Sequence, residues 1–127
     1  EKIALAIKKS VNNSGITLVF AVNYGGRDEL TRAVRHLARD VKAGKIDPSN
    51  GAVCPELIKT YLDTADIPDP DLIIRTSGEQ RLSGFMPWQS QYAEFAFPKF
   101  YFPEFTPERL DQLLLDFDNR ERRFGGN

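Results

Sequence analysis

The chain has 127 residues, of which 41% are hydrophobic and 28% are charged, and its formal net charge is −1. This length allows one domain, and the composition excludes a disordered chain. The nearly balanced charge disfavours a general nucleic-acid binder, because such a protein presents a strongly basic face. The sequence contains no run of about 18 apolar residues, so we expect no transmembrane helix.

The chain has one cysteine, Cys54, and one histidine, His36. A single cysteine cannot form a disulfide within the chain, which points to a reducing compartment and predicts a cytoplasmic location. One cysteine and one histidine cannot supply a zinc site of the usual ligand types. The chain starts without methionine and already in helical rhythm, so we expect it to be cut from something longer.

The spacing of apolar residues predicts a first helix over 1–13. The run from Thr17 to Val22 is continuously apolar and rich in β-formers, so we expect a strand that is buried on both faces, as in a parallel sheet. This strand ends in the loop Asn-Tyr-Gly-Gly-Arg at 23–27. Asp28 is expected to cap a strongly amphipathic helix that closes at 43–45.

The second half of the chain predicts a short helix that Pro55 opens, a short buried strand over 71–75 and a last helix that starts at 106–108. The segment 85–105 holds nine of the fourteen aromatic residues, and we expect them to pack in the core or in an interface. His36 falls off the apolar stripe of its helix and is expected to be exposed.

This order of elements predicts an α/β fold with a largely parallel sheet flanked by helices. Two buried strands are too few for a stable parallel sheet, since such a sheet needs more strands and cover on both faces. We therefore expect the sheet to be incomplete in this chain, with the rest of it missing or supplied by another chain.

The loop after the second predicted strand is the best candidate for an anion site, because ligands of open parallel sheets bind beyond the carboxyl ends of the strands. Arg75 stands at the strand end, Arg81 follows six residues later, Gly78 lies between them and Ser83 follows. Guanidinium forks, hydroxyls and free backbone amides suit a phosphate or diphosphate, on which we expect the two arginines to converge. The alternative is a solvated turn with two surface arginines.

Glu94 lies among the aromatic residues, where an unpaired carboxylate is costly to bury. It has three alternatives: to pair with an arginine, to bind Mg²⁺ or to point outward from a strand edge. A diphosphate usually brings Mg²⁺ held by one or two carboxylates, so Glu94 and the arginine loop form a consistent pair. The basic residues at the C-terminus form either a solvated helix end or, with the glycines after them, a tail that reaches a neighbour's site.

The stretch DLIIRTSGEQRLSGFMPWQSQYAEFAFP, the earlier NYGGR and the terminal RRFGG together resemble cis-prenyltransferases, and most closely the bacterial undecaprenyl diphosphate synthases or isoprenyl transferases. The resemblance implies a Mg²⁺-dependent, homodimeric transferase that condenses isopentenyl diphosphate onto an allylic prenyl diphosphate with cis geometry. The product of this family is the lipid carrier for peptidoglycan and other cell-wall glycans, which leaves a membrane-proximal location open.

The same motif match implies roles for individual residues. Glu94 would be the Mg²⁺ ligand, and the C-terminal Arg123 and Gly125 would reach the diphosphate site of the partner subunit. The full set of substrate-binding residues implied by the resemblance is Arg75, Arg81, Ser83, Gly78, Arg123 and Gly125.

Two departures from the family pattern stand out. The family's Asp-Gly-Asn-Gly-Arg loop, which carries the catalytic aspartate and binds the allylic diphosphate, has no match here, so residues 1–127 resemble the C-terminal part of one catalytic domain. We expect no catalytic residue in this chain and no activity from it alone. Gly84 stands where the family commonly has asparagine, and this glycine is expected to loosen the loop.

Two other functions remain as alternatives to part of a prenyltransferase. The chain could be a non-catalytic truncated or accessory subunit, or a generic phosphate-binding α/β module.

Overall fold

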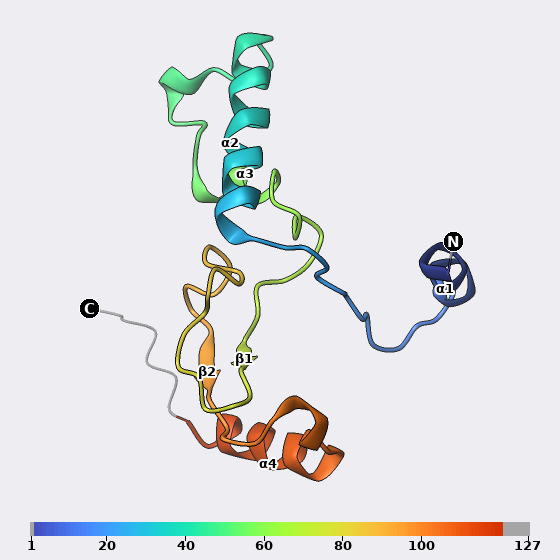
Figure 1. Cartoon of the computed structure of the whole chain (residues 1–127). Coiled ribbons are helices and arrows are strands. Elements are labelled where there is room, and N and C mark those ends of the chain that lie inside the picture. The colour runs from blue at the N-terminus through green and yellow to red at the C-terminus, as the bar shows by residue number, and fades with distance from the viewer. Residues whose placement is uncertain (1, 121–127) are drawn as a thin grey trace.

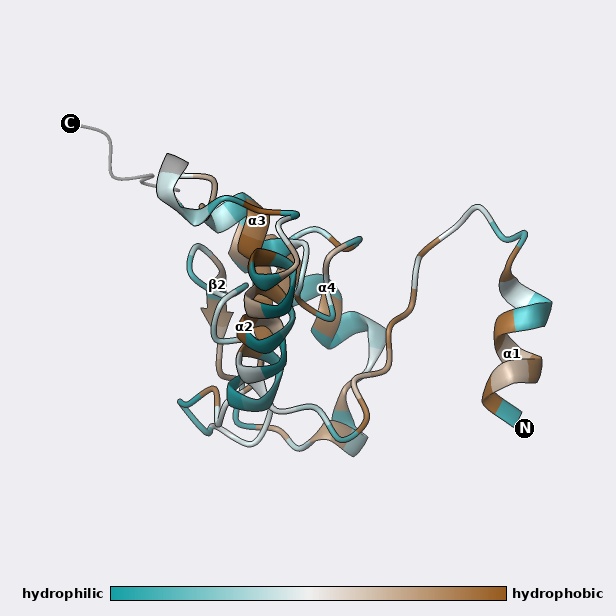
Figure 2. Cartoon of the chain, turned by 90° about the horizontal axis from the view of Figure 1, so that it is seen from above, coloured by the Kyte–Doolittle hydropathy of each residue, from teal (hydrophilic) through white to brown (hydrophobic). Residues whose placement is uncertain are grey.

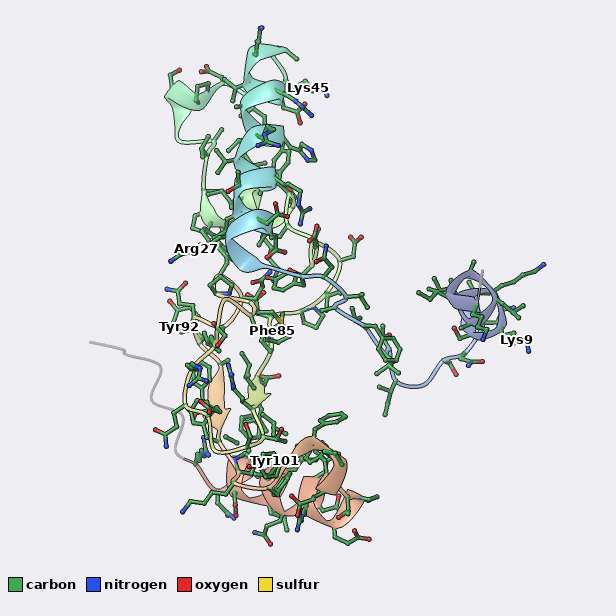
Figure 3. All side chains as sticks on the ribbon, viewed as in Figure 1. Lys9, Arg27, Lys45, Phe85, Tyr92 and Tyr101 are labelled. Atoms are coloured by element: carbon green, nitrogen blue, oxygen red, sulfur yellow. The ribbon has the colours of Figure 1, made fainter. Side chains whose placement is uncertain are left out.

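The structure is a computed structural model that describes residues 2–120. Helix α1, Lys2–Ser10, confirms the first predicted helix and lies apart from the other elements in both views (Figures 1 and 2). Its side chains, Lys9 among them, lie away from those of the other helices (Figure 3), and its apolar residues are exposed. In the part of the chain described, no helix is both long and apolar enough to cross a bilayer.

The predicted strand over 17–22 is wrong for this structure. The segment is an open trace between α1 and α2 (Figure 1), and Phe20 and Val22 are each 78% exposed. A strand needs a neighbour to receive its backbone hydrogen bonds, and within residues 2–120 the only two strands pair with each other. The apolar sequence of a buried strand is therefore present here without the partner strands that would bury it.

Helix α2, Gly26–Lys42, starts three residues earlier than predicted, since its cap is Gly25 and not Asp28. Its N-cap is Gly25, in an extended conformation. Asp28 instead lies in the first turn, where its negative charge interacts favourably with the helix dipole and stabilises the helix. The helix ends at Lys42 and closes over 43–45 as predicted, with Ala43 as its C-cap and Gly44 next at φ +72°. His36 is exposed, as expected.

Helix α3, Pro55–Lys59, packs against α2 and confirms the short helix. A 3-10 turn, η1, spans Pro48–Asn50 before it. The Tyr61 hydroxyl donates to Asp40 Oδ2 over 2.8 Å and so joins the segment after α3 to α2.

Strand β1, Leu72–Ile74, confirms the second predicted strand and pairs in parallel with β2, Glu94–Ala96. Ile73 lies opposite Phe95 in the register. The α/β architecture with a parallel sheet is thus confirmed, and the sheet has two strands within the described residues. The buried apolar side chains described are few: Ala33, Leu62, Ile73 and Ala96.

Helix α4, Pro107–Asp118, confirms the last predicted helix, and the Thr106 side chain caps it. A 3-10 turn, η2, spans Phe102–Glu104. The aromatic segment packs only in part: Phe100 stacks on Phe105 with ring centroids 5.7 Å apart, whereas Tyr92 is 79% exposed. Packing in the core thus holds for part of the segment within the described residues, and packing of the exposed rings in an interface stays a prediction.

Candidate functional site

Arg75 directly follows β1, and its side chain closes the loop that comes after the strand. Its Nη1 donates to Ser83 Oγ over 3.0 Å and also to the carbonyl oxygen of Arg81. Its backbone N–H donates to the carbonyl oxygen of Ala96 over 2.9 Å, which extends the parallel ladder by one bond. The guanidinium is therefore fixed between the sheet and the far end of the loop.

Gly78 does not provide the free amide that the sequence suggested. Its N–H donates to the carbonyl oxygen of Pro98 over 2.8 Å, and the N–H of Ser77 donates to that of Phe100 at the same distance. Gly78 has φ +68°, and an added Cβ would only make ordinary contact, 3.7 Å from Lys99 Cγ. Glycine is thus favoured here by the left-handed backbone and not by lack of space.

Arg81 projects from the loop, with 62% of its side chain exposed, and forms an ion pair with Glu79. Each guanidinium is engaged by acceptors of the loop itself, that of Arg75 by the carbonyl oxygen of Arg81 and that of Arg81 by Glu79, so the expected convergence of the two groups on a diphosphate stays a prediction. Both residues nevertheless line one cavity of about 230 Å³. Its other lining residues are apolar: Ile73, Ile74, Leu82 and Phe85.

Glu94 begins β2 and adopts the first of its three alternatives, a pair with an arginine. Its Oε2 accepts from Arg120 Nη1 over 2.9 Å, and the same nitrogen donates to the carbonyl oxygen of Phe95 over 3.0 Å. The Glu94 side chain is 36% exposed. Over residues 2–120 the structure contains no group of three or more His, Cys, Asp or Glu side chains that could hold a metal ion.

Arg123 and Gly125 lie outside the described residues, so their predicted reach toward a partner subunit stays a prediction.

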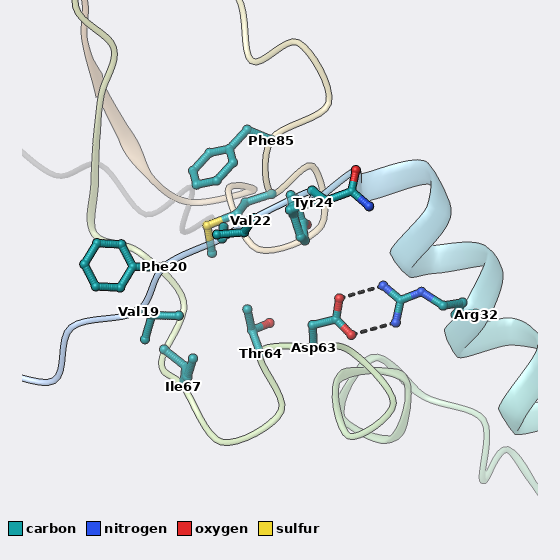
Figure 4. A pocket seen from close by; sticks show the side chains of 12 residues that line it. Val19, Phe20, Val22, Tyr24, Arg32, Asp63, Thr64, Ile67 and Phe85 are labelled. Atoms are coloured by element: carbon teal, nitrogen blue, oxygen red, sulfur yellow. Dashed lines mark hydrogen bonds and ion pairs between the residues drawn. The ribbon is translucent and has the colours of Figure 1, made fainter. Parts of the chain in front are cut away.

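The larger cavity, about 460 Å³, lies along the apolar segment before α2 (Figure 4). At its edge Arg32 and Asp63 form a two-pronged ion pair with N–O distances of 2.7 and 2.6 Å. Most of the other lining residues are apolar: Val19, Phe20, Ala21, Val22, Ile67, Phe85 and Met86. Phe85 lines both this cavity and the one at the arginine loop, so the two adjoin.

Sequence reasoning missed a buried carboxylate close to these cavities. Glu29, in the first turn of α2, is fully buried and accepts a hydrogen bond of 2.5 Å from the Tyr24 hydroxyl. Burial, and then this contact with Glu29, raises the pKa of Tyr24 to about 12. The available signal was the helical period itself, since Glu29 lies three residues after Gly26 and four before Ala33 on the buried face.

A family model described as "Putative undecaprenyl diphosphate synthase" matches residues 1–125. The isoprenyl transferase of Brucella abortus biovar 1 is 59% identical over 114 residues, which are 90% of this chain and 44% of that protein. The isoprenyl transferase of Bacillus thuringiensis subsp. konkukian is 47% identical over 121 residues, which are 95% of this chain and 46% of that protein.

Two solved structures share the fold. The lavandulyl diphosphate synthase of Lavandula x intermedia, solved with dimethylallyl diphosphate, matches with a TM-score of 0.91 and 36% identity over 98% of this chain and 52% of that one. A "probable undecaprenyl diphosphate synthase" from Campylobacter jejuni matches with a TM-score of 0.77 and 32% identity over 98% and 55%. The chain spans about half the length of these relatives. Because the family model matches nearly every residue, the chain belongs to the undecaprenyl diphosphate synthase family of prenyltransferases.

Proposed function

We propose that this chain carries the isopentenyl diphosphate-binding half of an undecaprenyl diphosphate synthase. The complete enzyme would add isopentenyl diphosphate to an allylic prenyl diphosphate with cis geometry and so make the lipid carrier for cell-wall glycans. The observation that carries this proposal is the cavity of about 230 Å³, which Arg75 and Arg81 line together with apolar residues.

The lining of this cavity matches the two parts of isopentenyl diphosphate. Guanidinium groups bind phosphate oxygens through parallel hydrogen bonds, and the apolar residues suit a short branched alkene. Arg81 would exchange Glu79 for the diphosphate, and breaking this exposed ion pair costs little. Arg75 is already held in place by Ser83, so its guanidinium needs little reordering on binding. Gly78 supports the same loop through its backbone conformation.

Glu94 fits the role of a Mg²⁺ ligand only as one part of a site. Mg²⁺ is commonly held by one or two carboxylates together with substrate phosphates and water, and Glu94 offers one carboxylate. To bind the ion, Glu94 Oε2 would have to give up its bond from Arg120. When bound, Mg²⁺ would neutralise the charge on a diphosphate leaving group.

Family membership supports the remaining parts of the proposal. The allylic co-substrate is supported by the lavender enzyme, which was solved with dimethylallyl diphosphate. We place the catalytic aspartate loop in the N-terminal part of the domain and no catalytic residue in residues 1–127, so this chain alone is proposed to be inactive. Arg123 and Gly125 would complete the diphosphate site of the second subunit in a cytoplasmic, membrane-proximal homodimer.

The test is Arg81→Ala in the full-length protein, with the KM measured for isopentenyl diphosphate. Loss of a charged hydrogen-bond donor costs about 1.5–3 kcal/mol, which predicts a KM raised by about 10- to 100-fold. Arg35→Ala, which removes an exposed arginine from α2, is the matched control and should leave this KM unchanged. An unchanged KM in Arg81→Ala would overturn the proposal.

A further inference from the structure

The buried carboxylate of Glu29 is held by neutral donors from three other segments. It accepts from the Tyr24 hydroxyl over 2.5 Å, from the backbone N–H of Asp63 over 2.9 Å and from Gln89 Nε2 over 3.1 and 3.2 Å. Taking a carboxylate out of water is costly unless its hydrogen bonds are replaced. These contacts therefore join the loop before α2, the turn after α3 and the segment that follows the arginine loop.

The contact with Glu29 orients the Gln89 amide and leaves its oxygen without a hydrogen bond among the described residues. Its side chain is 2% exposed, and its Nε2 also donates to Thr64 Oγ1 over 2.9 Å. Its Oε1 is buried without a hydrogen-bond partner among the described residues. Turning the amide over would set this oxygen against the Glu29 carboxylate, so the amide can face it in only one sense. The Glu29 carboxylate therefore fixes the orientation of this buried amide.

A second contact pins the same segment five residues earlier. The N–H of Gly26 donates to the carbonyl oxygen of Gly84 over 2.8 Å. A Cβ at Gly26 would lie 2.1 Å from Pro87 Cδ and 2.8 Å from that carbonyl oxygen, so only glycine allows this approach. The segment from Gly84 to Gln89 is therefore fixed at both ends to the first turn of α2.

The pinned segment begins next to the arginine loop. Ser83, which precedes Gly84, has φ +50° and accepts the hydrogen bond from Arg75. Met86, inside the segment, has φ +47°. Non-glycine residues keep such backbone angles only where their surroundings hold them firmly. The contacts of Gly26 and Glu29 supply that hold.

We infer that Glu29 and Gln89 are positioning residues for the diphosphate loop: their buried contact holds the segment Gly84–Gln89 on α2 and thereby sets Ser83 and the guanidinium of Arg75. This inference rests on the proposed function of that loop. It assigns to the Asn-Tyr-Gly-Gly-Arg motif a share in substrate binding that needs no contact with the substrate.

The experiment exchanges the two side chains in the full-length protein. Gln89→Glu sets two buried carboxylates against each other, and we expect the KM for isopentenyl diphosphate to rise by at least about tenfold while that for the allylic substrate stays within about twofold. The exchange Glu29→Gln with Gln89→Glu restores an amide facing a carboxylate, and we expect it to recover most of the lost affinity. A merely structural role predicts a lower kcat from fewer folded molecules, with both KM values unchanged.

Gly26→Ala tests the other end of the segment and replaces the first variant if Gln89→Glu does not fold. The added methyl group must push Pro87 and Gly84 away, so the KM for isopentenyl diphosphate should rise. Gly15→Ala is the matched control, since its Cβ has no neighbour within 4 Å among the described residues and Gly15 lies outside both α2 and the pinned segment. Unchanged KM values for isopentenyl diphosphate in both Gln89→Glu and Gly26→Ala would overturn the inference.

Arg81→Ala, measured beside these variants, separates the two proposals. If Arg81→Ala raises the KM while the Gln89 and Gly26 variants do not, the positioning role fails and the proposed function stands. If Arg81→Ala leaves the KM unchanged, the proposed function itself fails.

Discussion

Arg75 and Ser83 lie eight residues apart in sequence, yet Arg75 Nη1 is 3.0 Å from Ser83 Oγ. The same nitrogen donates to the carbonyl oxygen of Arg81, so one side chain spans the loop from the sheet to its far end. The loop is thus ordered around a cation that is already in place, and the hydroxyl group of Ser83 helps to fix that cation.

This relationship predicts the effect of Ser83→Ala. The variant removes one hydrogen-bond acceptor, which is worth about 1 kcal/mol, so the KM for isopentenyl diphosphate should rise by about fivefold. Arg75→Lys should have a larger effect, because lysine lacks the other guanidinium nitrogens that could bind the diphosphate while Nη1 holds the loop. Steady-state kinetics of the full-length protein measure both, with the exposed Ser14→Ala as control. Equal KM values in wild type and Arg75→Lys would contradict the assignment.

Gly84 has φ +79°, and a Cβ there would have no neighbour within 4 Å among the described residues. Asparagine tolerates this backbone region better than most residues, and it lowers the entropy of the unfolded chain. We therefore expect Gly84→Asn to change the free energy of unfolding by less than about 0.5 kcal/mol. Gly84→Val should cost about 1–2 kcal/mol, because a β-branched side chain clashes at positive φ. Urea denaturation compares them, and an asparagine variant as unstable as the valine variant would contradict this explanation.

Tyr24 has a pKa raised to about 12 by burial and by its bond to Glu29, against about 10 in an unfolded chain. The folded state therefore keeps a proton that the unfolded state loses, so this contribution to stability is complete below about pH 10 and is lost as the pH rises toward about 12. The stability advantage of wild type over Tyr24→Phe should shrink across this range. Urea unfolding at about pH 8 and about pH 11 tests it; an advantage that does not change with pH would refute the coupling.

The ion pair between Glu94 and Arg120 predicts that substitutions of its two members shift the Mg²⁺ requirement in opposite directions. Glu94→Gln removes the proposed ligand, and the Mg²⁺ concentration for half-maximal rate should rise by at least about tenfold. Arg120→Ala frees Glu94 Oε2 from its ion pair and should lower that concentration. Titration of the full-length enzyme with Mg²⁺ measures both, and Glu108→Gln in the first turn of α4 is the control. The same Mg²⁺ requirement in wild type and Glu94→Gln would remove Glu94 from the metal site.

Helices whose pattern lies within their own sequence could be predicted. The amphipathic period identifies α2, and Thr106 followed by Pro107 marks the start of α4. The prediction of a strand over 17–22 was wrong because a strand needs neighbouring strands to receive its hydrogen bonds, and the described residues offer none beside this segment. β2 was not predicted, because three residues within an aromatic segment show no periodicity of their own.

The candidate site was predictable as a set of residues but not as a geometry. Residue types and spacing identify Arg75 and Arg81, and the structure brings both to one cavity. The hydrogen bond from the Gly78 amide to the Pro98 carbonyl oxygen could not be predicted, because it joins residues twenty positions apart. The buried Glu29 was missed for a related reason: its neutral partners come from distant segments.

The open segment before α2 bears on how residues 1–127 behave when produced by themselves. Ile16, Leu18 and Phe20 are 97%, 73% and 78% exposed, in a stretch with strong β-propensity and no charge. Bare backbone groups flanked by such side chains are a template for strand addition from another molecule. We expect the isolated polypeptide to self-associate as its concentration rises, and a lysine in place of Phe20 to delay the onset of turbidity.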